Sequence, residues 1–406
     1  MPTENISIST ASGHALSGSL EMPTGLVRGA ALFAHCFTCT KQSRAAIEVA
    51  RALAGEGIAC LRFDFTGLGG SEGEFGRAGF ATDVGDLVDA ASYLFERFAQ
   101  PILLVGHSLG GAAVLAAADD LGFDKVAAIA TIGAPSDVPH VLHNIKGDLD
   151  AIRDQGQGEV TIGGREFCLG REFIERVESA DLLAEVGRLR RPLLFLHSPT
   201  DDIVGIEHAS ALFAAAKHPK SFVSLEGADH LLLKDADARF VASVIASWAH
   251  RYLPMREDWP MPDEGVVVKS GHGKFGTEVH TVSHRFIADE PKSYGGDDTG
   301  PTPYDLLNAA LGTCTAMTMK MYADRKGWPL EGVTVEVRHE RNHKEECHHV
   351  AAMEQGTQLQ ALHRTINLQG DGLDEEQRAK IIEIADKCPV HRTLEGELHI
   401  HTEAAG

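Results

Sequence analysis

Short apolar runs alternate with amphipathic stretches over residues 29–250 of the chain. The apolar runs predict buried strands at Gly29–Phe33, Ile58–Phe63, Ile102–Val105, Ala127–Ile132, Leu193–Leu196 and Ser221–Leu225. The stretches between them carry hydrophobic positions at helical spacing and predict helices at Arg44–Ala54, Thr82–Phe98, Gly111–Ala118, Glu207–Ala216 and Ala236–His250. This alternation is typical of an α/β fold, with a doubly wound parallel sheet that helices cover on both faces.

Two segments depart from the alternation. Ile6–Thr10 and His14–Glu21 precede it and predict an antiparallel hairpin at one edge of the sheet. Residues 135–190 interrupt it and are polar, with several glycines. We expect this insertion to form a small lid over a functional site.

The composition changes at residues 253–265, where three prolines stand among acidic residues and predict a stiff, solvated connector. We therefore expect a first domain at 1–255, a linker at 256–265 and a second domain at 266–406. The second domain begins with strands and continues with a helix at 303–325, strands near 333–339 and 363–369, a helix at 374–387 and a strand at 397–402. That order indicates an α+β domain rather than a continuation of the parallel sheet.

The net charge and the hydropathy of the chain limit the partners and the location that we expect. The net charge of the 406 residues is −21, and such a surface repels nucleic acid and anionic membranes, so we expect neither as a partner. No apolar run approaches a membrane span and no basic-then-apolar signal opens the chain, which favours a cytoplasmic protein. Seven cysteines, an odd number, argue against a secreted disulfide framework.

The segment Gly106-His107-Ser108-Leu109-Gly110 separates a predicted strand from a predicted helix. A serine on a tight strand-to-helix turn is typical of a nucleophile elbow, which needs small residues at 106 and 110. The alternatives are a serine in an ordinary glycine-rich turn and a phosphate-binding loop. The motif lacks the Gly-Lys-Ser/Thr continuation of a phosphate-binding loop.

A nucleophilic serine needs a base, and the base needs an acid to orient it. Asp201 and Asp202 follow the strand at 193–196, and His230 follows the strand at 221–225. The carboxyl ends of parallel strands share one edge of the sheet, where such folds place their sites. We predict Ser108 as nucleophile, His230 as base and Asp201, in preference to Asp202, as the orienting acid. The alternatives are a helix N-cap for the aspartates and a surface loop for the histidine.

These motifs, together with a turn of the pattern Asp-x-x-Gly-x-Gly-x-Ser at 64–71, resemble the α/β-hydrolase superfamily near its small-lid serine esterases and aminopeptidases. The resemblance covers about the first 250 residues. It implies a carboxylesterase-like serine hydrolase that takes a small acyl substrate through an ester, thioester or amide bond. It also implies an oxyanion hole made by the backbone N–H groups of Phe37 and Leu109.

The loop that would supply Phe37 contains Cys36-Phe37-Thr38-Cys39, with Cys36 where the family usually has glycine. A Cys-x-x-Cys can be a redox pair or half of a zinc site. No second Cys-x-x-Cys exists in the chain, and the oxyanion loop already explains the position. We therefore expect neither redox nor metal chemistry here.

Two cysteines mark the second domain. Leu307, Leu311, Cys314, Thr318 and Met321 recur at helical spacing, which predicts that Cys314 lies on a buried stripe. Cys388 stands before Pro389 and is expected to end a helix. Both neighbourhoods together resemble the OsmC/Ohr family of thiol peroxidases over about residues 266–402.

This resemblance implies a peroxidatic Cys314 and a resolving Cys388, a hydroperoxide substrate, an external dithiol reductant and a homodimer formed through the C-terminal domain. Asp305 stands at the position of the family's glutamate. No arginine matches the family's pattern clearly, and the basic candidates are Lys274, Arg285 and Lys292.

The segment with His339, His343, Cys347, His348 and His349 could hold a metal, but its charge favours a solvated loop. We predict no metal and no cofactor. The sequence thus predicts a bifunctional protein, a serine hydrolase fused to a thiol peroxidase. One alternative makes the second domain a non-catalytic dimerisation and ligand-binding module, and another makes the hydrolase fold a binding scaffold.

Overall fold

The computed structural model describes residues 1–36, 39–74, 80–139, 142, 145–162, 165–178, 181–254, 262–341 and 360–404. The chain forms two compact units. Unit 1 comprises Met1–Ile287 and Lys292–Thr299, and unit 2 comprises Ala288–Pro291 and Gly300–Gly406. The linker predicted at 256–265 falls largely outside the described residues, and its bounds stay a prediction.

Unit 1 is built around an eight-stranded sheet in the order β1-β2-β4-β3-β5-β6-β10-β11. Its strands are β1 (Thr3–Ser9), β2 (Ala15–Glu21), β3 (Gly29–Ala34), β4 (Ile58–Phe63), β5 (Ile102–His107), β6 (Val126–Ile132), β10 (Leu193–His197) and β11 (Lys220–Ser224). Six neighbouring strands pair in parallel, in the order β4, β3, β5, β6, β10 and β11. At the edge, β1 and β2 form an antiparallel hairpin, and β2 pairs antiparallel with β4. The predicted α/β sheet and its edge hairpin are confirmed.

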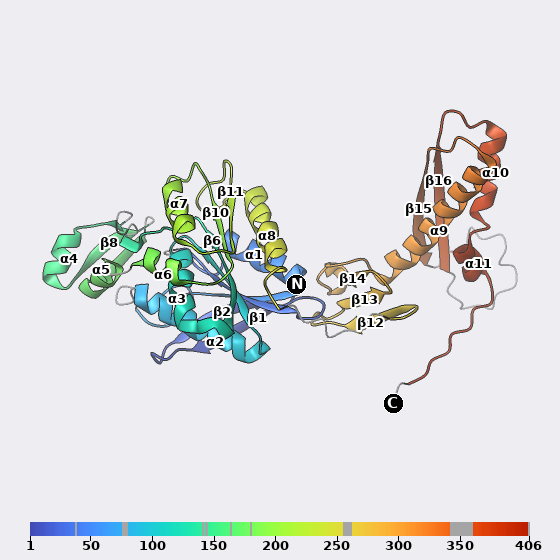
Figure 1. Ribbon diagram of the computed structural model, residues 1–406. Coiled ribbons are helices and arrows are strands. Elements are labelled where there is room, and N and C mark those ends of the chain that lie inside the picture. The colour runs from blue at the N-terminus through green and yellow to red at the C-terminus, as the bar shows by residue number, and fades with distance from the viewer. Residues whose placement is uncertain are drawn as a thin grey trace. The chain divides into compact units, whose positions relative to one another are not determined.

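Helices cover both faces of this sheet (Figure 1). They are α1 (Arg44–Gly55) and α8 (Asp235–Ala249) on one face, and α2 (Phe80–Phe98), α3 (Leu109–Lys125) and α7 (Ile206–Ala215) on the other. The side chains of β5 divide between the two faces, Leu104 in the core beneath α3 and Leu103 in the core beneath α1. Since both faces are buried, the strands read as continuous apolar runs.

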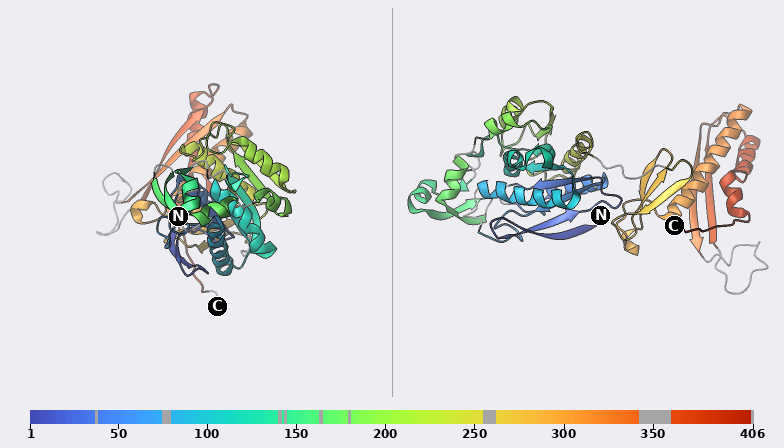
Figure 2. Two further views of the ribbon diagram at one scale, coloured as in Figure 1. Left: turned by 90° about the vertical axis from the view of Figure 1, so that its left-hand side faces the viewer. Right: turned by 60° about the horizontal axis from the view of Figure 1, so that its bottom comes forward.

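The lid predicted at 135–190 is a small α+β insertion at one end of unit 1 (Figure 2). Its antiparallel sheet has the order β7-β8-β9. Its elements are β7 (Ile145–Lys146), α4 (Leu149–Gln155), β8 (Gln157–Ile162), β9 (Arg165–Gly170), α5 (Arg171–Glu178) and α6 (Leu182–Arg188). The insertion buries apolar side chains of its own, such as Ile152 and Leu169.

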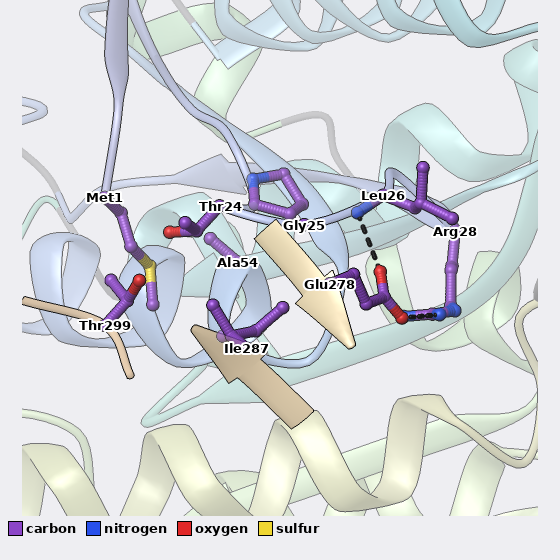
Figure 3. Close-up of a pocket in the computed structure, with 12 residues that line it drawn as sticks. Met1, Thr24, Gly25, Leu26, Arg28, Ala54, Glu278, Ile287 and Thr299 are labelled. Carbon is purple, nitrogen blue, oxygen red and sulfur yellow. Dashed lines mark hydrogen bonds and ion pairs between the residues drawn. The ribbon is translucent and has the colours of Figure 1, made fainter. Parts of the chain in front are cut away.

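A three-stranded sheet of β12 (Val266–Ser270), β13 (Thr277–Thr281) and β14 (Arg285–Ala288) follows the linker. Glu278 of β13 is buried and ties this sheet to the loop before β3 (Figure 3). Its carboxylate accepts the Leu26 N–H at 3.0 Å, pairs with Arg28 and accepts the His280 Nε2–H at 3.0 Å. A buried carboxylate with three donors is the arrangement in which burial of charge is tolerated.

Unit 2 packs one long helix against a two-stranded antiparallel sheet. Its elements are α9 (Pro303–Lys326), β15 (Gly332–Arg341), β16 (Gln360–Gln369), α10 (Glu375–Ala385) and α11 (Pro389–Glu395), and a 3₁₀ turn at Lys292–Tyr294 belongs to unit 1. The strand predicted at 397–402 is wrong, because these residues have no neighbouring strand in the described chain. The helix predicted to end at Cys388 ends at Ala385, and Cys388 instead caps the start of α11.

The buried stripe of α9 differs from the predicted one. Leu311, Thr315, Met319 and Ala323 are buried at a spacing of four residues. Cys314 is half-buried and Met321 is 72% exposed. The buried face therefore runs through Thr315 instead of Cys314, and the Thr315 hydroxyl can be buried because it donates to the Leu311 carbonyl at 2.7 Å.

Candidate active site

Ser108 occupies the turn between β5 and α3. Its backbone has φ 55° and ψ −124°, a conformation that residues with a side chain rarely adopt. The Ser108 N–H donates to the Ile132 carbonyl at 2.8 Å, which ties the strained turn to the neighbouring strand. The geometry is that of a sharp strand-to-helix elbow with the hydroxyl at its tip.

Two glycines let the backbone close around this elbow. A Cβ atom at position 110 would overlap the carbonyl oxygens of Ala34 and His35, and one at position 106 would overlap the backbone of Gly110. The obstacles are main-chain atoms and cannot rotate away. The predicted need for small residues at 106 and 110 is therefore met by close backbone approach.

His230 lies between a serine and a carboxylate. Its Nε2 atom is 2.9 Å from Ser108 Oγ, and its Nδ1 atom is 2.7 Å from Asp201 Oδ2. Asp201 Oδ1 accepts the N–H groups of Ile203 and Val204, each at 2.9 Å. The structure thus brings together the three predicted residues, whereas Asp202 is exposed and is not among the hydrogen-bond partners of His230.

The environment of Asp201 favours its charged form. Burial by itself raises the pKa of this carboxyl, but the hydrogen bonds from His230 and from the Val204 and Ile203 amides outweigh burial. The net pKa lies below the usual value of an aspartate. A carboxylate that is ionised at neutral pH can hold the Nδ1 proton of His230 and stabilise the imidazolium.

Two further buried histidines support the site. His107 Nε2 donates to the backbone carbonyl of His230 at 2.7 Å, and His35 Nδ1 donates to the carbonyl of Cys36 at 2.8 Å. Burial is the largest cause that lowers the pKa of His107 to about 3 and the pKa of His35 to about 4. Both rings are therefore neutral. Sequence reasoning missed His107, since its position inside the serine motif admits any residue.

The predicted oxyanion donors are described only in part. Leu109 is the first residue of α3, where backbone N–H groups lack a partner within the helix. Phe37 lies outside the described residues. Cys36 and Cys39, on either side of it, are joined by a disulfide, although the sequence analysis expected no redox pair there.

Cys314 and Cys388 of unit 2 are free thiols, unlike Cys36 and Cys39. Cys314 is a half-buried free thiol on α9, and Cys388 is a buried free thiol. Cys388 Sγ accepts the His391 N–H at 3.3 Å and lies 3.7 Å from the hydroxyl of Thr315. Thr315, the neighbour of Cys314 on α9, thus contacts Cys388.

Arg364 of β16 lies beside this thiol and was missed by the sequence analysis. One guanidinium nitrogen donates to Thr315 Oγ1 at 3.1 Å, and the other pairs with Asp386 at 2.7 Å. Arg364 shares one face of β16 with Ile366 and Leu368, which are half-buried. A charged residue within an otherwise apolar face of a strand is the signal that could have revealed it.

Asp305 caps the N-terminus of α9. The Asp305 carboxylate accepts the Thr302 N–H at 3.0 Å and its hydroxyl at 2.8 Å, which forms a capping box at the start of α9. The candidates Lys274, Arg285 and Lys292 belong to unit 1.

His339 stacks on Tyr304, with ring centroids 4.1 Å apart. The other residues of the cluster, His343, Cys347, His348 and His349, lie outside the described residues. In the part of the chain that is described, no group of three or more His, Cys, Asp or Glu residues could hold a metal. No helix among those residues is both long and apolar enough to cross a membrane.

The fold and the serine site define an α/β hydrolase. The chain matches the family model of alpha/beta hydrolases over residues 26–277 and that of OsmC-like proteins over residues 295–403. The first match covers more than half of the chain, so the protein belongs to the alpha/beta hydrolase family and carries an OsmC-like domain after it. Both resemblances drawn from the sequence are confirmed.

Curated relatives resemble part of the chain. It is 23% identical over 169 residues to the uncharacterized protein YfhR of Escherichia coli O157:H7, which is 42% of this chain and 52% of that protein. It is 25% identical over 201 residues to YfhR of Salmonella typhi, which is 46% and 62% of the two proteins. The chain thus spans about half the length of the curated relatives it matches.

Solved structures resemble unit 1. The crystal structure of the esterase domain from a Rhodothermus marinus protein is 47% identical, with a TM-score of 0.51, and the match covers 62% of this chain and 99% of that one. Est1E from Butyrivibrio proteoclasticus with ferulic acid bound is 21% identical, with a TM-score of 0.52 over 61% of this chain and 98% of that one. At that identity, the likeness to Est1E shows the fold alone.

Proposed function

We propose that the first domain is a serine hydrolase in which Ser108, His230 and Asp201 form the catalytic triad. The observation that carries this proposal is the hydrogen-bonded chain from Ser108 Oγ through both ring nitrogens of His230 to Asp201. Ser108 Oγ attacks the acyl carbonyl while His230 Nε2 takes its proton, and His230 then returns the proton to the leaving group. Water repeats the sequence on the acyl-enzyme.

The developing negative charge needs backbone donors. Leu109, at the N-terminus of α3, is proposed as one donor and Phe37 as the other. The substrate is a small molecule with an ester, thioester or amide bond, and the lid at 135–190 selects its acyl group. An ester is favoured, because the 47% identical structure is an esterase domain.

An activity-based fluorophosphonate probe tests the triad. We expect the probe to label the wild-type protein at Ser108, and Ser108→Ala to abolish both labelling and the hydrolysis of p-nitrophenyl acetate. Labelling that persists in Ser108→Ala, or a wild-type protein that neither reacts nor hydrolyses, would show that the hydrolase fold serves binding instead.

A second proposed activity is that of a thiol peroxidase in the OsmC-like domain. The family match at 295–403 contains both Cys314 and Cys388. Arg364 donates a hydrogen bond to the Thr315 hydroxyl, which lies 3.7 Å from Cys388 Sγ. The Cys314 thiolate attacks the terminal peroxide oxygen and releases an alcohol. Cys388 then attacks the sulfenic acid, water leaves, and an external dithiol reduces the disulfide.

Adjacent residues of a helix point about 100° apart, and Thr315, next to Cys314, is the residue whose hydroxyl lies 3.7 Å from Cys388 Sγ. The proposed disulfide therefore needs the Cys314 side chain to reach Cys388 from the position beside Thr315. Mass spectrometry after one equivalent of an organic hydroperoxide tests it, with a Cys314–Cys388 disulfide that either Cys→Ser change blocks as the expected result. Thiols that stay unmodified would favour the alternative, a non-catalytic dimerisation and ligand-binding module.

We also propose a cytoplasmic homodimer formed through the C-terminal domain. Several large apolar side chains of unit 2 are exposed in the single chain, among them Met317, Met321 and Ile382. Exposed apolar side chains of this size are typical of a surface that another chain covers. Light scattering should report twice the mass of the chain, and Met321→Glu should lower it towards the monomer.

A further inference from the structure

Arg364 of β16 holds the turn that carries Cys388 from both sides. Its Nη1 donates to the carbonyl of Ala385 at 3.1 Å, and its Nη2 donates to the Asp386 carboxylate at 2.7 Å and to His391 Nδ1 at 3.1 Å. Ala385 ends α10 and His391 lies in α11, so these acceptors bracket Cys388 in the sequence. A single guanidinium therefore fixes the position of the turn.

The same guanidinium reaches the helix that carries Cys314. Its Nη1 donates to the Thr315 hydroxyl at 3.1 Å, and that oxygen lies 3.7 Å from Cys388 Sγ. Thr315 is fully buried and directly follows Cys314 on α9. The sulfur of Cys388 is therefore held against the turn of α9 on which Cys314 lies.

The hydroxyl of Thr315 determines which way the thiol proton of Cys388 points. The Thr315 proton is donated to the Leu311 carbonyl at 2.7 Å, and one lone pair accepts the Arg364 N–H. The second lone pair accepts the S–H of Cys388, since a hydroxyl has one donor and two acceptor sites. The Cys388 sulfur in turn accepts the His391 N–H at 3.3 Å. When the thiol proton leaves, the sulfur keeps this donor.

We propose that Arg364 and Thr315 are positioning residues that hold Cys388 for its attack on an oxidised Cys314. The inference rests on the thiol peroxidase proposed above. Cys388 Sγ attacks the sulfenic sulfur of Cys314, the S–O bond breaks, and the released hydroxide takes the thiol proton and leaves as water. The two thiols have then given two electrons to one hydroperoxide, which left as an alcohol when the sulfenic acid formed. Arg364 and Thr315 exchange no atoms in either step.

The attack joins two groups of one chain, so its rate depends on how well the two sulfur atoms are placed. Arg364 spans its acceptors with two forked nitrogens at fixed geometry, which a lysine ammonium lacks. Loss of the fork frees the turn at 385–391 from α9, and we expect the disulfide to close roughly 10-fold more slowly. The first step takes place at Cys314, to which Arg364 does not donate in the described part of the chain, and its rate should stay unchanged.

Thr313 and Thr315 give a matched pair of variants, because they flank Cys314. The hydroxyl of each donates to a carbonyl of the preceding turn, at 2.6 Å for Thr313 and 2.7 Å for Thr315. Thr313 is exposed, whereas Thr315 is buried against Cys388. Thr315→Val keeps the shape of the side chain and removes the hydroxyl, Thr315→Ser keeps the hydroxyl, and Thr313→Val is the control.

Oxidation of the full chain by one equivalent of cumene hydroperoxide separates the two steps. Dimedone traps the Cys314 sulfenic acid, and mass spectrometry counts the Cys314–Cys388 disulfide. We expect Thr315→Val, Arg364→Met and Arg364→Lys to form the sulfenic acid at the wild-type rate and to close the disulfide roughly 10-fold more slowly. Thr315→Ser and Thr313→Val should close it as the wild type does.

Diamide, which oxidises thiols without a peroxide, should close the disulfide with the same order among the variants. Closure at the wild-type rate in Thr315→Val would overturn the proposal, as would both steps slowed alike in that variant or a wild type in which diamide forms no disulfide. The Thr315 variants decide the question if loss of Arg364 unfolds unit 2. A wild type that diamide closes and hydroperoxide leaves unmodified would instead mark the failure of the proposed peroxidase.

Discussion

The Nε2 atom of His107 donates a hydrogen bond to the backbone carbonyl of His230 at 2.7 Å. The residue before the nucleophile thereby holds the loop that carries the base. Burial lowers the pKa of His107 to about 3, so the ring stays neutral. Its one proton is on Nε2, where it is donated to the carbonyl. The hydrogen bond therefore acts at every pH at which the hydrolase would operate.

Removal of this hydrogen bond should weaken catalysis without removing a reacting group. We expect His107→Leu to lower kcat for p-nitrophenyl acetate by roughly 10-fold, because a misplaced base loses the geometry of proton transfer. His107→Gln, whose amide can donate to the same carbonyl, should recover most of the loss. Equal losses in both variants would assign His107 to packing alone.

Folding stability should fall as the pH is lowered from about 6.5 towards 4. Unfolded histidine has a pKa of about 6.5, whereas the pKa of His35 is lowered to about 4 and that of His107 to about 3. The unfolded state thus binds more protons in this interval, so the stability present above pH 6.5 is lost as the pH falls through it.

Each ring should contribute a loss of about 2 kcal/mol between pH 6.5 and 5. Urea denaturation of unit 1 at the two values measures the loss, and His107→Gln should reduce it. Asp86 acts in the opposite direction, because burial raises its pKa to about 6. An equal loss in wild type and variant would contradict the role assigned to His107.

The two adjacent aspartates offer a matched pair of variants. Asp201→Asn should lower kcat by about 10⁴, because an amide cannot hold the proton of His230 on Nδ1. Asp202→Asn should change kcat little, because Asp202 is exposed and does not contact His230. Steady-state kinetics decide between them, and a reversed order of effects would move the acid to Asp202.

Two glycines, the closely packed Gly110 of the elbow and the exposed Gly85 of α2, give a matched test of the packing of the elbow. Gly110→Ala places a Cβ atom against the backbone carbonyls of Ala34 and His35, so we expect loss of soluble protein or of fluorophosphonate labelling. Gly85 of α2 is exposed, with no atom within 4 Å of the new Cβ. Gly85→Ala should therefore raise the free energy of unfolding by about 0.5–1 kcal/mol.

The buried ion pair between Glu278 and Arg28 predicts a large effect on stability. Glu278→Gln leaves the guanidinium of Arg28 buried without its counter-charge and should destabilise unit 1 by about 3 kcal/mol, measured by urea unfolding. Glu336→Gln, which breaks an exposed pair with Arg338, should have no measurable effect. Comparable losses in the two variants would mean that burial of Glu278 is incomplete in solution.

The two units differ, for physical reasons, in how closely their elements match the pattern of the sequence. In unit 1 the strands are buried on both faces, and largely apolar runs such as Ile58–Phe63 mark them with their bounds. In unit 2 the burial depends on one narrow face of α9, and the predicted stripe through Met321 was wrong. The segment 397–402 alternates as a strand does, but a strand also needs a neighbour, which periodicity does not supply.

The sequence by itself determined the α/β order of unit 1, the serine turn, and the candidate base and acid, because period, chain order and turn chemistry are local properties. Only the tertiary structure shows that Asp201, already preferred to Asp202 from the sequence, contacts His230, and that His107 holds the loop of the base. It also decided that Arg364 bonds to the Thr315 hydroxyl that contacts Cys388, and that Cys36 and Cys39 form a disulfide. These contacts depend on distances between segments remote in sequence or on the closure of a turn, and no pattern of residues encodes such distances.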